Sequence, residues 1–421
     1  MQENNKITKE SPIRVRFAPS PTGIMHLGNI RTALMNFLFA RQKNGAFVLR
    51  IEDTDPQRDF DPEGHQIIQD MEWLNLNYDE GPIKGGPYAP YFQSKRTDLY
   101  QTQLNELIAK KSVYRCFCTA AELDTKRQRQ ITLKQPPRYD QACLKLSEDN
   151  IKANLDSDTP FIWRFAIDHD QKITFNDLGH GKMTFDLTHF SDFPVTRQDG
   201  SFTFIFANCV DDIAMQMNYV FRGDDHISNT VNQVILYHAF GADVPTFWHM
   251  PILCNLDGKK LSKRDFGFSL KDLRDAGFMH EAIINYLSII GGSFQKEIMS
   301  MDEIIAAYKF DHISSTSQIK YDVEKLRWVN HKWIASLSPE QLLERCMPSL
   351  EKNYDDASRR DKDELLKLVE IVQSDLVTLN DIVPAVQFFF TKPVVTSEQV
   401  SSVKPNAPLE EISKILVSNL G

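Results

Sequence analysis

A loop rich in proline and glycine, RFAPSPTGIMHLGN (residues 16–29), comes just before a run of residues that is typical of a helix. A loop of this kind between a strand and a helix directs backbone N–H groups and the positive end of the helix dipole towards an anion. His26 would add a hydrogen bond to a phosphate oxygen, and Gly28 would let the ligand approach the backbone closely. The pattern predicts a phosphate site, and the alternative is a tight turn with a surface histidine.

A second loop, DGKKLSKRD (residues 257–265), places four basic residues around Ser262 and lies between Gly258 and Gly267. A flexible cationic loop suits the clamping of a polyphosphate, although taken alone it is better explained as a solvated run of charge. The two loops together favour chemistry on a nucleotide phosphate.

A third group of candidate residues consists of cysteines. CFC brings Cys116 and Cys118 close together, and Cys143 follows about 25 residues later. Three thiolates with a fourth oxygen or nitrogen ligand would complete a tetrahedral Zn²⁺ site, and the alternative is three ordinary buried thiols. Six cysteines in 421 residues are too few for a disulfide scaffold, so we expect reduced thiols or metal ligands.

These residues need elements that position them, and the first elements read as strand, helix, strand. IRVRFAPS (13–20) predicts a strand that runs into a loop, and IRTALMNFLFARQKNG (30–45) predicts an amphipathic helix closed by Gly45. AFVLRIEDTD (46–55) predicts a second strand that ends in acids. A crossover of this kind predicts parallel strands in an open α/β sheet, with ligands at the carboxyl ends of the strands.

The same pattern returns later, and helices follow it. YVFRGDDHISNTVNQVILYHAFG (219–241) predicts a strand, a polar loop and a helix with Gly241 as its C-cap. Ser338 and Pro339 stand where the N-cap and first position of a helix are expected. We therefore expect an α/β fold. A Rossmann-type parallel-sheet domain is expected in two halves, at residues 12–77 and 192–313, with an inserted α+β domain between them at residues 78–191. An all-helical C-terminal part is expected at residues 314–421.

Composition limits the function classes. The net charge of −9 argues weakly against a nucleic-acid partner, but the run TKRQRQITLKQPPR (125–138) could still make a basic face. No segment approaches the roughly 20 apolar residues of a membrane span. The first residues, MQENNKITKESP, lack the apolar region of a secretory signal. We expect a cytoplasmic protein with no membrane partner.

The two loops resemble the paired HIGH-type and KMSKS-type signatures of class I aminoacyl-tRNA synthetases. KLSKR (260–264) is similar to the second signature, with Leu for Met and Arg for the final Ser. The resemblance is to glutamyl-tRNA synthetases of bacterial type and continues in order through LRIEDTDPQR, VFRGDDHISNTVNQ and YDVEKLRWVNHKWI, from about Arg14 to at least Trp333. It implies a ligase that uses ATP to attach glutamate to tRNA(Glu) through glutamyl-adenylate.

The resemblance also implies how ATP is held. The helix start and the second loop would bind its phosphates, with Mg²⁺ neutralising the remaining charge. The implied catalytic residues are His26, Lys260 and Lys263, of which Lys263 would stabilise the transition state and the departing pyrophosphate. The implied ATP-binding residues are Thr22, His26, Gly28, Asn29, Asp225 and Lys263.

Glutamate carries two carboxylates and one ammonium, so it needs two cationic partners and one anionic partner. By resemblance, Arg16 contacts the side-chain carboxylate and Arg222 the α-carboxylate, because the arginine fork bonds both oxygens. Glu52 with Ser20 would contact the ammonium. The implied glutamate-binding residues are Arg16, Ala18, Ser20, Glu52, Phe204, Asn208 and Arg222.

Phe204 departs from the family pattern, which usually has Tyr at this position. A lost hydroxyl removes one donor, which is worth about 0.5–1.5 kcal/mol in net terms. The departure affects the expected affinity for glutamate or its discrimination from glutamine.

Some bacterial glutamyl-tRNA synthetases carry a similar Cys-x-Cys with Tyr-x-x-x-Cys in the insertion that binds the tRNA acceptor. The resemblance therefore implies zinc ligation by Cys116, Cys118, Tyr139 and Cys143.

Other expectations and alternatives remain open at this point. The helical part is expected to bind the anticodon and to be shorter than in most bacterial relatives, and the protein is expected to be a monomer. One alternative is a tRNA-binding paralogue with weakened or altered charging, through misacylation of tRNA(Gln) or tRNA modification. Another is an unrelated nucleotidyltransferase of similar α/β architecture.

Overall fold

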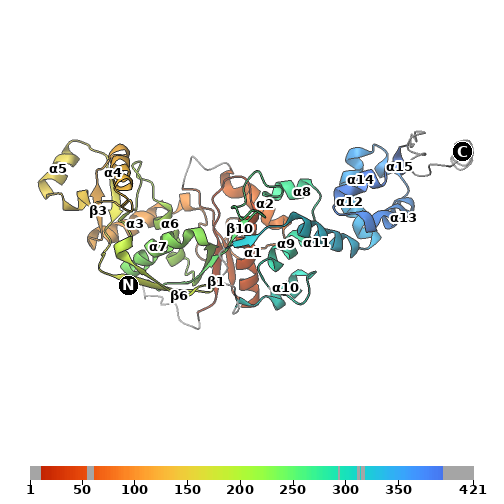
Figure 1. Ribbon diagram of the computed structural model, residues 1–421, viewed down its shortest axis with the longest axis horizontal. Coiled ribbons are helices and arrows are strands. Elements are labelled where there is room, and N and C mark those ends of the chain that lie inside the picture. Colours follow the sequence, from red (N-terminus) through yellow and green to blue (C-terminus); the bar gives the residue numbers. More distant parts are fainter. Residues whose placement is uncertain (1–10, 55–60, 293, 311–312, 314–317, 392–421) are drawn as a thin grey trace, which may run out of the picture. The chain divides into compact units, whose positions relative to one another are not determined.

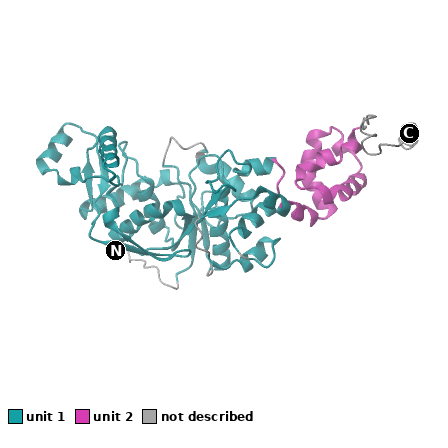
Figure 2. Cartoon of the chain, in the orientation of Figure 1, with its two compact units in different colours: residues 1–275, 280–329 teal, residues 276–279, 330–421 magenta. Residues whose placement is uncertain are grey.

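The computed structural model describes residues 11–54, 61–292, 294–310, 313 and 318–391. They belong to two compact units, one of residues 1–275 and 280–329 and one of residues 276–279 and 330–421 (Figure 2). Three predicted regions include residues outside the described ones: 55–60 of the first parallel-sheet half, with 55–58 of LRIEDTDPQR among them; 293 and 311–312 of the second half; and 314–317 with 392–421 of the helical part.

Short strands alternate with helices through the first unit (Figure 1). The strands are β1 (Arg14–Phe17), β2 (Ala46–Leu49), β3 (Val113–Cys116), β4 (Ile162–Phe165), β5 (Lys172–Asp177), β6 (Gly181–Asp186), β7 (Phe193–Pro194), β8 (Tyr219–Gly223), β9 (Thr246–Met250), β10 (Ile252–Cys254) and β11 (Gln318–Lys320). The helices are α1 (Leu27–Gln42), α2 (His65–Trp73), α3 (Thr97–Ala109), α4 (Ala120–Thr132), α5 (Glu148–Asp156), α6 (Phe204–Ala214), α7 (Ile227–Phe240), α8 (Leu270–Asp275), α9 (His280–Ile289), α10 (Met301–Ala307) and the first part of α11 (Val323–Ala335).

Parallel strand pairs with helical crossovers carry the predicted site loops. β1 pairs in parallel with β2 across α1, with Arg14 opposite Ala46, and β8 pairs in parallel with β9 across α7, with Tyr219 opposite Thr246. The intervening chain forms the antiparallel sheet β3–β4–β7 and the hairpin β5–β6, which joins β9 at one residue pair. The predicted α/β class with a parallel sheet and an α+β insertion is confirmed.

Helix α1 differs from the prediction at its start. It begins at Leu27, three residues before the predicted position, because His26 caps it: the His26 Nδ1 accepts a hydrogen bond from the Asn29 N–H at 3.3 Å. The predicted amphipathic character is wrong as well, because buried residues occur on nearly every side of the helix. A helix surrounded by protein belongs to the interior of the unit.

The end of α1 also corrects a prediction. Asn44, with φ of 52°, takes the left-handed conformation that was expected of Gly45. The Gly45 N–H then bonds to the Ala40 carbonyl at 2.8 Å, as in a Schellman motif. Gly45 is needed for space, because a Cβ there would lie 2.5 Å from the carbonyl oxygen of Ile13. The predicted C-cap role of Gly241 is confirmed, with φ of 69° after α7.

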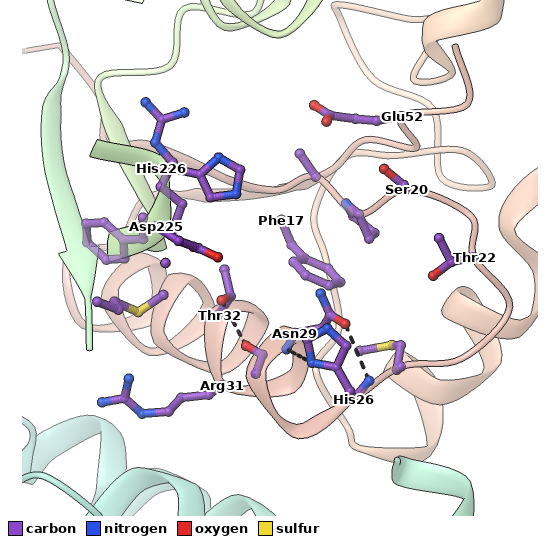
Figure 3. Close-up of a pocket in the computed structure, with 18 of the residues that line it drawn as sticks. Phe17, Ser20, Thr22, His26, Asn29, Arg31, Thr32, Glu52, Asp225 and His226 are labelled. Carbon is purple, nitrogen blue, oxygen red and sulfur yellow. Dashed lines mark hydrogen bonds between the residues drawn. The ribbon is translucent and has the colours of Figure 1, made fainter. Parts of the chain in front are cut away.

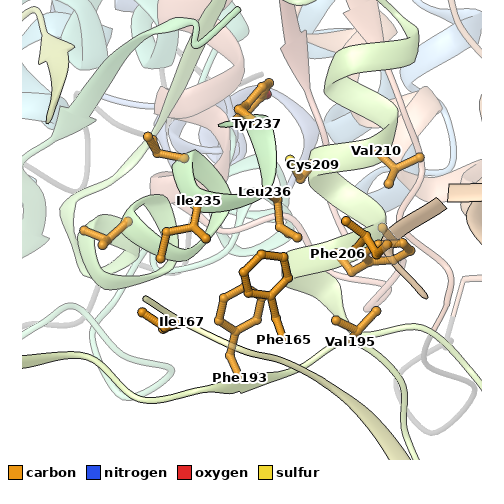
Figure 4. Close-up of a cluster of buried hydrophobic side chains, with 14 of the residues drawn as sticks. Phe165, Ile167, Phe193, Val195, Phe206, Cys209, Val210, Ile235, Leu236 and Tyr237 are labelled. Atoms are coloured by element: carbon orange, nitrogen blue, oxygen red, sulfur yellow. The ribbon is translucent and has the colours of Figure 1, made fainter. Parts of the chain in front are cut away.

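One hydrophobic core joins the insertion to the helices that follow it (Figure 4). Phe165 of β4 stacks on Phe193 of β7 at 5.3 Å between ring centroids, and the same cluster contains Phe206 of α6 and Leu236 of α7. Each fully buried side chain of this size stabilises the fold by about 1.5–3 kcal/mol. The insertion and helices α6 and α7 therefore form one packed body.

In the described residues of the second unit, the secondary-structure elements are helices joined by turns. After α11 it contains α12 (Pro339–Asn353), α13 (Lys362–Val372), α14 (Ile382–Ala385) and α15 (Gln387–Phe390). Ser338 and Pro339 are the N-cap and first residue of α12, as predicted, and the Ser338 hydroxyl accepts from the Gln341 N–H. All six cysteines are free thiols. Within the described residues, no helix combines the length and the apolarity that crossing a membrane would require.

Gly45→Ala is expected to destabilise the protein by about 1–3 kcal/mol, because the new methyl group must displace the backbone of Ile13. Denaturant unfolding measures the change. Lys43→Ala is the matched control, since this exposed side chain lies two residues away. Equal stability of the Gly45 variant and the wild type would contradict the packing described here.

Candidate functional site

A cavity of about 650 Å³ lies where β1, β8 and the start of α1 meet (Figure 3). Such a place, at the carboxyl ends of parallel strands, is where open α/β sheets bind ligands. The predicted residues that line it are Arg16, Ala18, Ser20, Thr22, His26, Gly28, Asn29, Glu52, Phe204, Asn208, Arg222, Asp225 and Lys260. Lys263 is exposed on the second loop and does not line the cavity.

His26 faces this cavity from the start of α1. Burial lowers the pKa of His26, and the nearby Lys260 lowers it further, so the ring is neutral near pH 7. Because Nδ1 accepts from Asn29, the proton of the neutral ring lies on Nε2, which is then free to donate. Gly28 leaves room for the ring, since a Cβ there would lie 3.1 Å from two of its atoms.

The second loop follows β10 and returns to the first loop. The Leu27 N–H bonds to the Phe268 carbonyl at 3.0 Å, and the Phe268 ring stacks on His26 with 5.2 Å between centroids. The Lys260 Nζ lies 2.9 Å from the Asp225 carboxylate in a largely exposed ion pair. The two predicted loops therefore meet at one wall of the cavity.

The opposite wall rests on a buried ion network centred on Arg50. This guanidinium, with no exposed side-chain surface, lies 2.7 Å from Asp212, 3.0 Å from Glu52 and 3.7 Å from Asp211. Burial alone would lower the pKa of Arg50, but these three carboxylates together raise it. The Arg16 Nε lies 3.1 Å from the Asp212 carboxylate.

Glu52 is held at the edge of this network. Its Oε1 accepts hydrogen bonds from Arg50 at 3.0 Å and from Asn208 at 2.6 Å. The Asn208 amide is oriented in turn by Gln233, which donates to its oxygen at 2.9 Å. Burial raises the pKa of Glu52 despite the opposing effect of Arg50.

Arg222 is a buried cation of the site that has no carboxylate partner among the described residues. Its Nη2 donates to the Thr230 hydroxyl at 2.5 Å, whereas Nε and Nη1 are buried without a hydrogen-bond partner among the described residues. Burial, followed by the neighbouring Arg16, lowers the pKa of Arg222 to about 10. A buried guanidinium with unused donors is suited to bind an anion.

The buried ions of this wall are paired unevenly. Arg16, Arg50 and Arg96 each lie against a buried carboxylate of Asp211 or Asp212. Arg222 has no carboxylate within ion-pair distance among the described residues, so its guanidinium is open to an anionic ligand.

Sequence reasoning missed the residues that support the predicted ones. Arg50 stands inside the motif LRIEDTDPQR, and Asp212 ends the acidic pair of FIFANCVDDIA, where ionisable residues on an apolar helix signal buried partners. His226, whose ring lies 5.6 Å from that of Phe204, was missed too. Burial, with Arg222 next, lowers the pKa of His226 to about 4, so it is a neutral polar group of the cavity.

The cysteines gather at a second place, in the insertion. The sulfur atoms of Cys116, Cys118 and Cys143 lie within 4.8 Å of one another. The Tyr139 hydroxyl lies 3.3 Å from the Cys116 sulfur and 3.6 Å from the Cys118 sulfur. The four predicted ligand atoms are therefore close together.

Comparisons with known proteins bear on this chain as a whole. The family model described as the catalytic domain of class I tRNA synthetases (E and Q) matches residues 12–328. The glutamate–tRNA ligases of Bacillus licheniformis and Bacillus subtilis are 34% and 35% identical to the chain, and each match spans 97% of it and 85% or 88% of the relative.

Two solved structures of glutamate–tRNA ligases are similar to this chain over most of its length. A crystal structure of a glutamate tRNA ligase from Elizabethkingia meningosepticum in complex with its amino acid has a TM-score of 0.86 at 32% identity and covers 95% of this chain and 84% of its own. Glutamate-tRNA synthetase from Elizabethkingia anophelis has a TM-score of 0.84 at 33% identity, with 93% and 84% covered.

Arg50→Met is expected to destabilise the protein by about 3–5 kcal/mol, because it leaves three buried carboxylates without their shared cation. Arg41→Met is the control, since the Arg41–Asp79 pair is partly exposed and such pairs contribute about 0–1 kcal/mol. Both changes are measured by denaturant unfolding. Similar losses in the two variants would contradict a central role for Arg50.

Proposed function

The chain belongs to the glutamate–tRNA ligase family of class I tRNA synthetases, and we propose that its cavity joins glutamate to tRNA(Glu) through glutamyl-adenylate. The match to glutamate–tRNA ligases over 97% of the chain favours a charging enzyme over an unrelated nucleotidyltransferase.

The buried guanidinium of Arg222, with two unpartnered nitrogen atoms, is the observation that carries the glutamate assignment. Arg222 takes the α-carboxylate, since its Nε and Nη1 have no other partner among the described residues. Arg16, whose Nε is tied to Asp212, takes the side-chain carboxylate. Glu52 and Ser20 take the ammonium. Phe204 offers no hydroxyl, so discrimination against glutamine depends on Arg16.

ATP binds at the other wall, where α1 starts. The positive end of the α1 dipole and the Nε2 proton of His26 meet its phosphates, and Thr22, Gly28, Asn29 and Asp225 complete this surface. Class I synthetases in general use ATP with Mg²⁺, which neutralises phosphate charge when bound. Lys260 borders the cavity, whereas Lys263 must move with its loop to reach the pyrophosphate.

Catalysis then consists of positioning and charge stabilisation. An α-carboxylate oxygen of glutamate attacks the α-phosphate of ATP, forming a new P–O bond while the bond to pyrophosphate breaks. The ribose hydroxyl of the terminal adenosine of tRNA next attacks the activated carbonyl, and AMP leaves. Buried arginines hold the first reactants, so no covalent enzyme intermediate is needed.

The remaining segments are assigned to tRNA. Residues 78–191 contact the acceptor, and α4 within them has no buried side chain and carries Lys126, Arg127 and Arg129. The helical part 314–421 reads the anticodon. Action as a monomer in the cytoplasm stays a prediction.

The cysteine cluster fits zinc by the chemistry of its donors. Three thiol sulfur atoms lie within 4.8 Å of one another, as tetrahedral thiolate ligands require after small adjustments. Tyr139 supplies the fourth ligand through its hydroxyl. Zinc at this place stabilises the local fold of the insertion.

Arg222→Gln is expected to raise KM for glutamate at least a hundredfold while KM for ATP stays within threefold, because a charge-assisted bond to a carboxylate is lost. Lys263→Ala, in contrast, is expected to lower kcat at least a hundredfold with KM for glutamate unchanged. Pyrophosphate exchange with glutamate and tRNA present measures both. An unchanged KM for glutamate in Arg222→Gln would overturn the glutamate assignment.

The protein purified without chelator is expected to carry about one zinc ion per chain, and the variant with Cys116→Ser and Cys118→Ser is expected to carry none. Metal analysis of both proteins tests this. Cys254→Ala, which changes a buried thiol outside the cluster, is expected to retain the metal. Wild-type protein without zinc would mean that the three cysteines are ordinary thiols.

A further inference from the structure

A chain of hydrogen bonds leads from Arg222 into the interior, away from the cavity. The Thr230 hydroxyl of α7, which accepts from the Arg222 Nη2 at 2.5 Å, lies 2.6 Å from the His249 Nε2. The Nδ1 of His249, on β9, lies 2.7 Å from the carboxylate of Asp177 at the end of β5. Thr230, His249 and Asp177 are all at least 97% buried.

The donor and the acceptor of each hydrogen bond in this series follow from the groups at its two ends, Asp177 and Arg222. Asp177 also accepts from the His249 N–H, the His180 ring and two further backbone N–H groups, and these bonds lower the pKa of its carboxyl to about 2 although burial opposes them. The ionised carboxylate only accepts, so the His249 Nδ1 donates to it. Burial lowers the pKa of His249 as well, and Arg222 adds to this effect, so the ring is neutral and its Nε2 accepts.

The Thr230 hydroxyl has one proton and two acceptors within reach, the His249 Nε2 at 2.6 Å and the His226 carbonyl at 3.1 Å. Because the His249 Nε2 carries no proton, the hydroxyl donates to it, and the oxygen lone pairs of Thr230 face Arg222, which only donates. If the imidazole carried the opposite tautomer, His249 and Arg222 would both donate to the Thr230 oxygen, and the hydroxyl proton would go to the His226 carbonyl. Asp177 therefore sets the tautomer of His249, and this tautomer directs the Thr230 proton to His249 and the oxygen lone pairs to Arg222.

Arg222 has few other contacts that hold its plane. The guanidinium donates a hydrogen bond from Nη2 to Thr230, whereas Nε and Nη1 have no partner among the described residues. The guanidinium carbon lies 5.3 Å from the ring centroid of Phe247. The position of Thr230 thus decides where Nε and Nη1 point.

We propose that Asp177, His249 and Thr230 are positioning residues that orient Arg222 towards the α-carboxylate of glutamate. This inference rests on the proposed role of Arg222. The order carboxylate, imidazole, hydroxyl also occurs in hydrolytic triads. Here the hydroxyl is fully buried and already accepts from Arg222, so it orients a binding group and attacks no substrate.

The test compares Thr230→Val, which removes the hydroxyl, with Thr230→Ser, which keeps it. Steady-state charging of tRNA(Glu) by the full chain gives KM for glutamate, KM for ATP and kcat. Thr230→Val is expected to raise KM for glutamate about tenfold or more, with KM for ATP and kcat within threefold of wild type. Thr230→Ser is expected to return KM for glutamate to within threefold of wild type.

A second readout separates orientation of Arg222 from general loosening of the cavity. The α-amide of glutamate and the γ-amide, glutamine, are used as competitive inhibitors of charging. Thr230→Val is expected to reduce the preference for glutamate over the α-amide about tenfold and to leave its preference over glutamine within threefold. A general loosening would reduce both preferences alike and would overturn the inference.

A further variant tests the inference if Thr230→Val folds poorly. His249→Phe keeps a ring beside Phe247 and lacks both nitrogens, so it is expected to give the same selective loss. If Arg222→Gln raises KM for glutamate while Thr230→Val and His249→Phe do not, the positioning chain is wrong and the role of Arg222 stands. If Arg222→Gln has no effect either, the proposed glutamate site is wrong.

Discussion

The buried guanidinium of Arg50 is the interaction on which the site depends. Arg50 directly follows β2, and its guanidinium contacts Asp211 and Asp212 of α6 as well as Glu52, two residues further along the chain. Each of the two aspartates is shared with another arginine, Arg96 or Arg16. Such ions are costly to bury and become tolerable only when all partners are in place, so the network fixes the distance between the strand and the helix.

The same network explains how a rigid fold can retain affinity for a small charged substrate. A buried cation without a carboxylate partner is unfavourable, and Arg222 is such a cation, whose pKa is lowered to about 10 by burial and by Arg16. A ligand carboxylate that meets its Nε and Nη1 relieves this cost. In the proposed complex, the α-carboxylate of glutamate completes this ion network, which couples substrate binding to the stability of α6 and β8.

The two walls of the cavity differ in rigidity for physical reasons. Arg16, Glu52 and Arg222 are almost fully buried and held by neighbours that are buried too. The opposite wall ends in a loop whose Lys260 is largely exposed and whose Lys263 lies outside the cavity. A screened, exposed ion pair costs little to break. The wall proposed to bind glutamate is therefore preformed, while the wall proposed to bind the ATP phosphates is suited to rearrange around its ligand.

The sequence by itself determined the strand–helix–strand order, the cap residues Ser338 and Gly241 and the residue types of both loops, because these depend on local patterns of a few residues. It misjudged the ends of α1, since the capping by His26 and the close approach of Ile13 to Gly45 depend on packing. Only the tertiary structure decided that Arg50, some 160 residues before Asp212, joins it, and that Thr230, His249 and Asp177 stand behind Arg222. The energy of a buried charge depends on which distant groups surround it, and no local pattern contains that information.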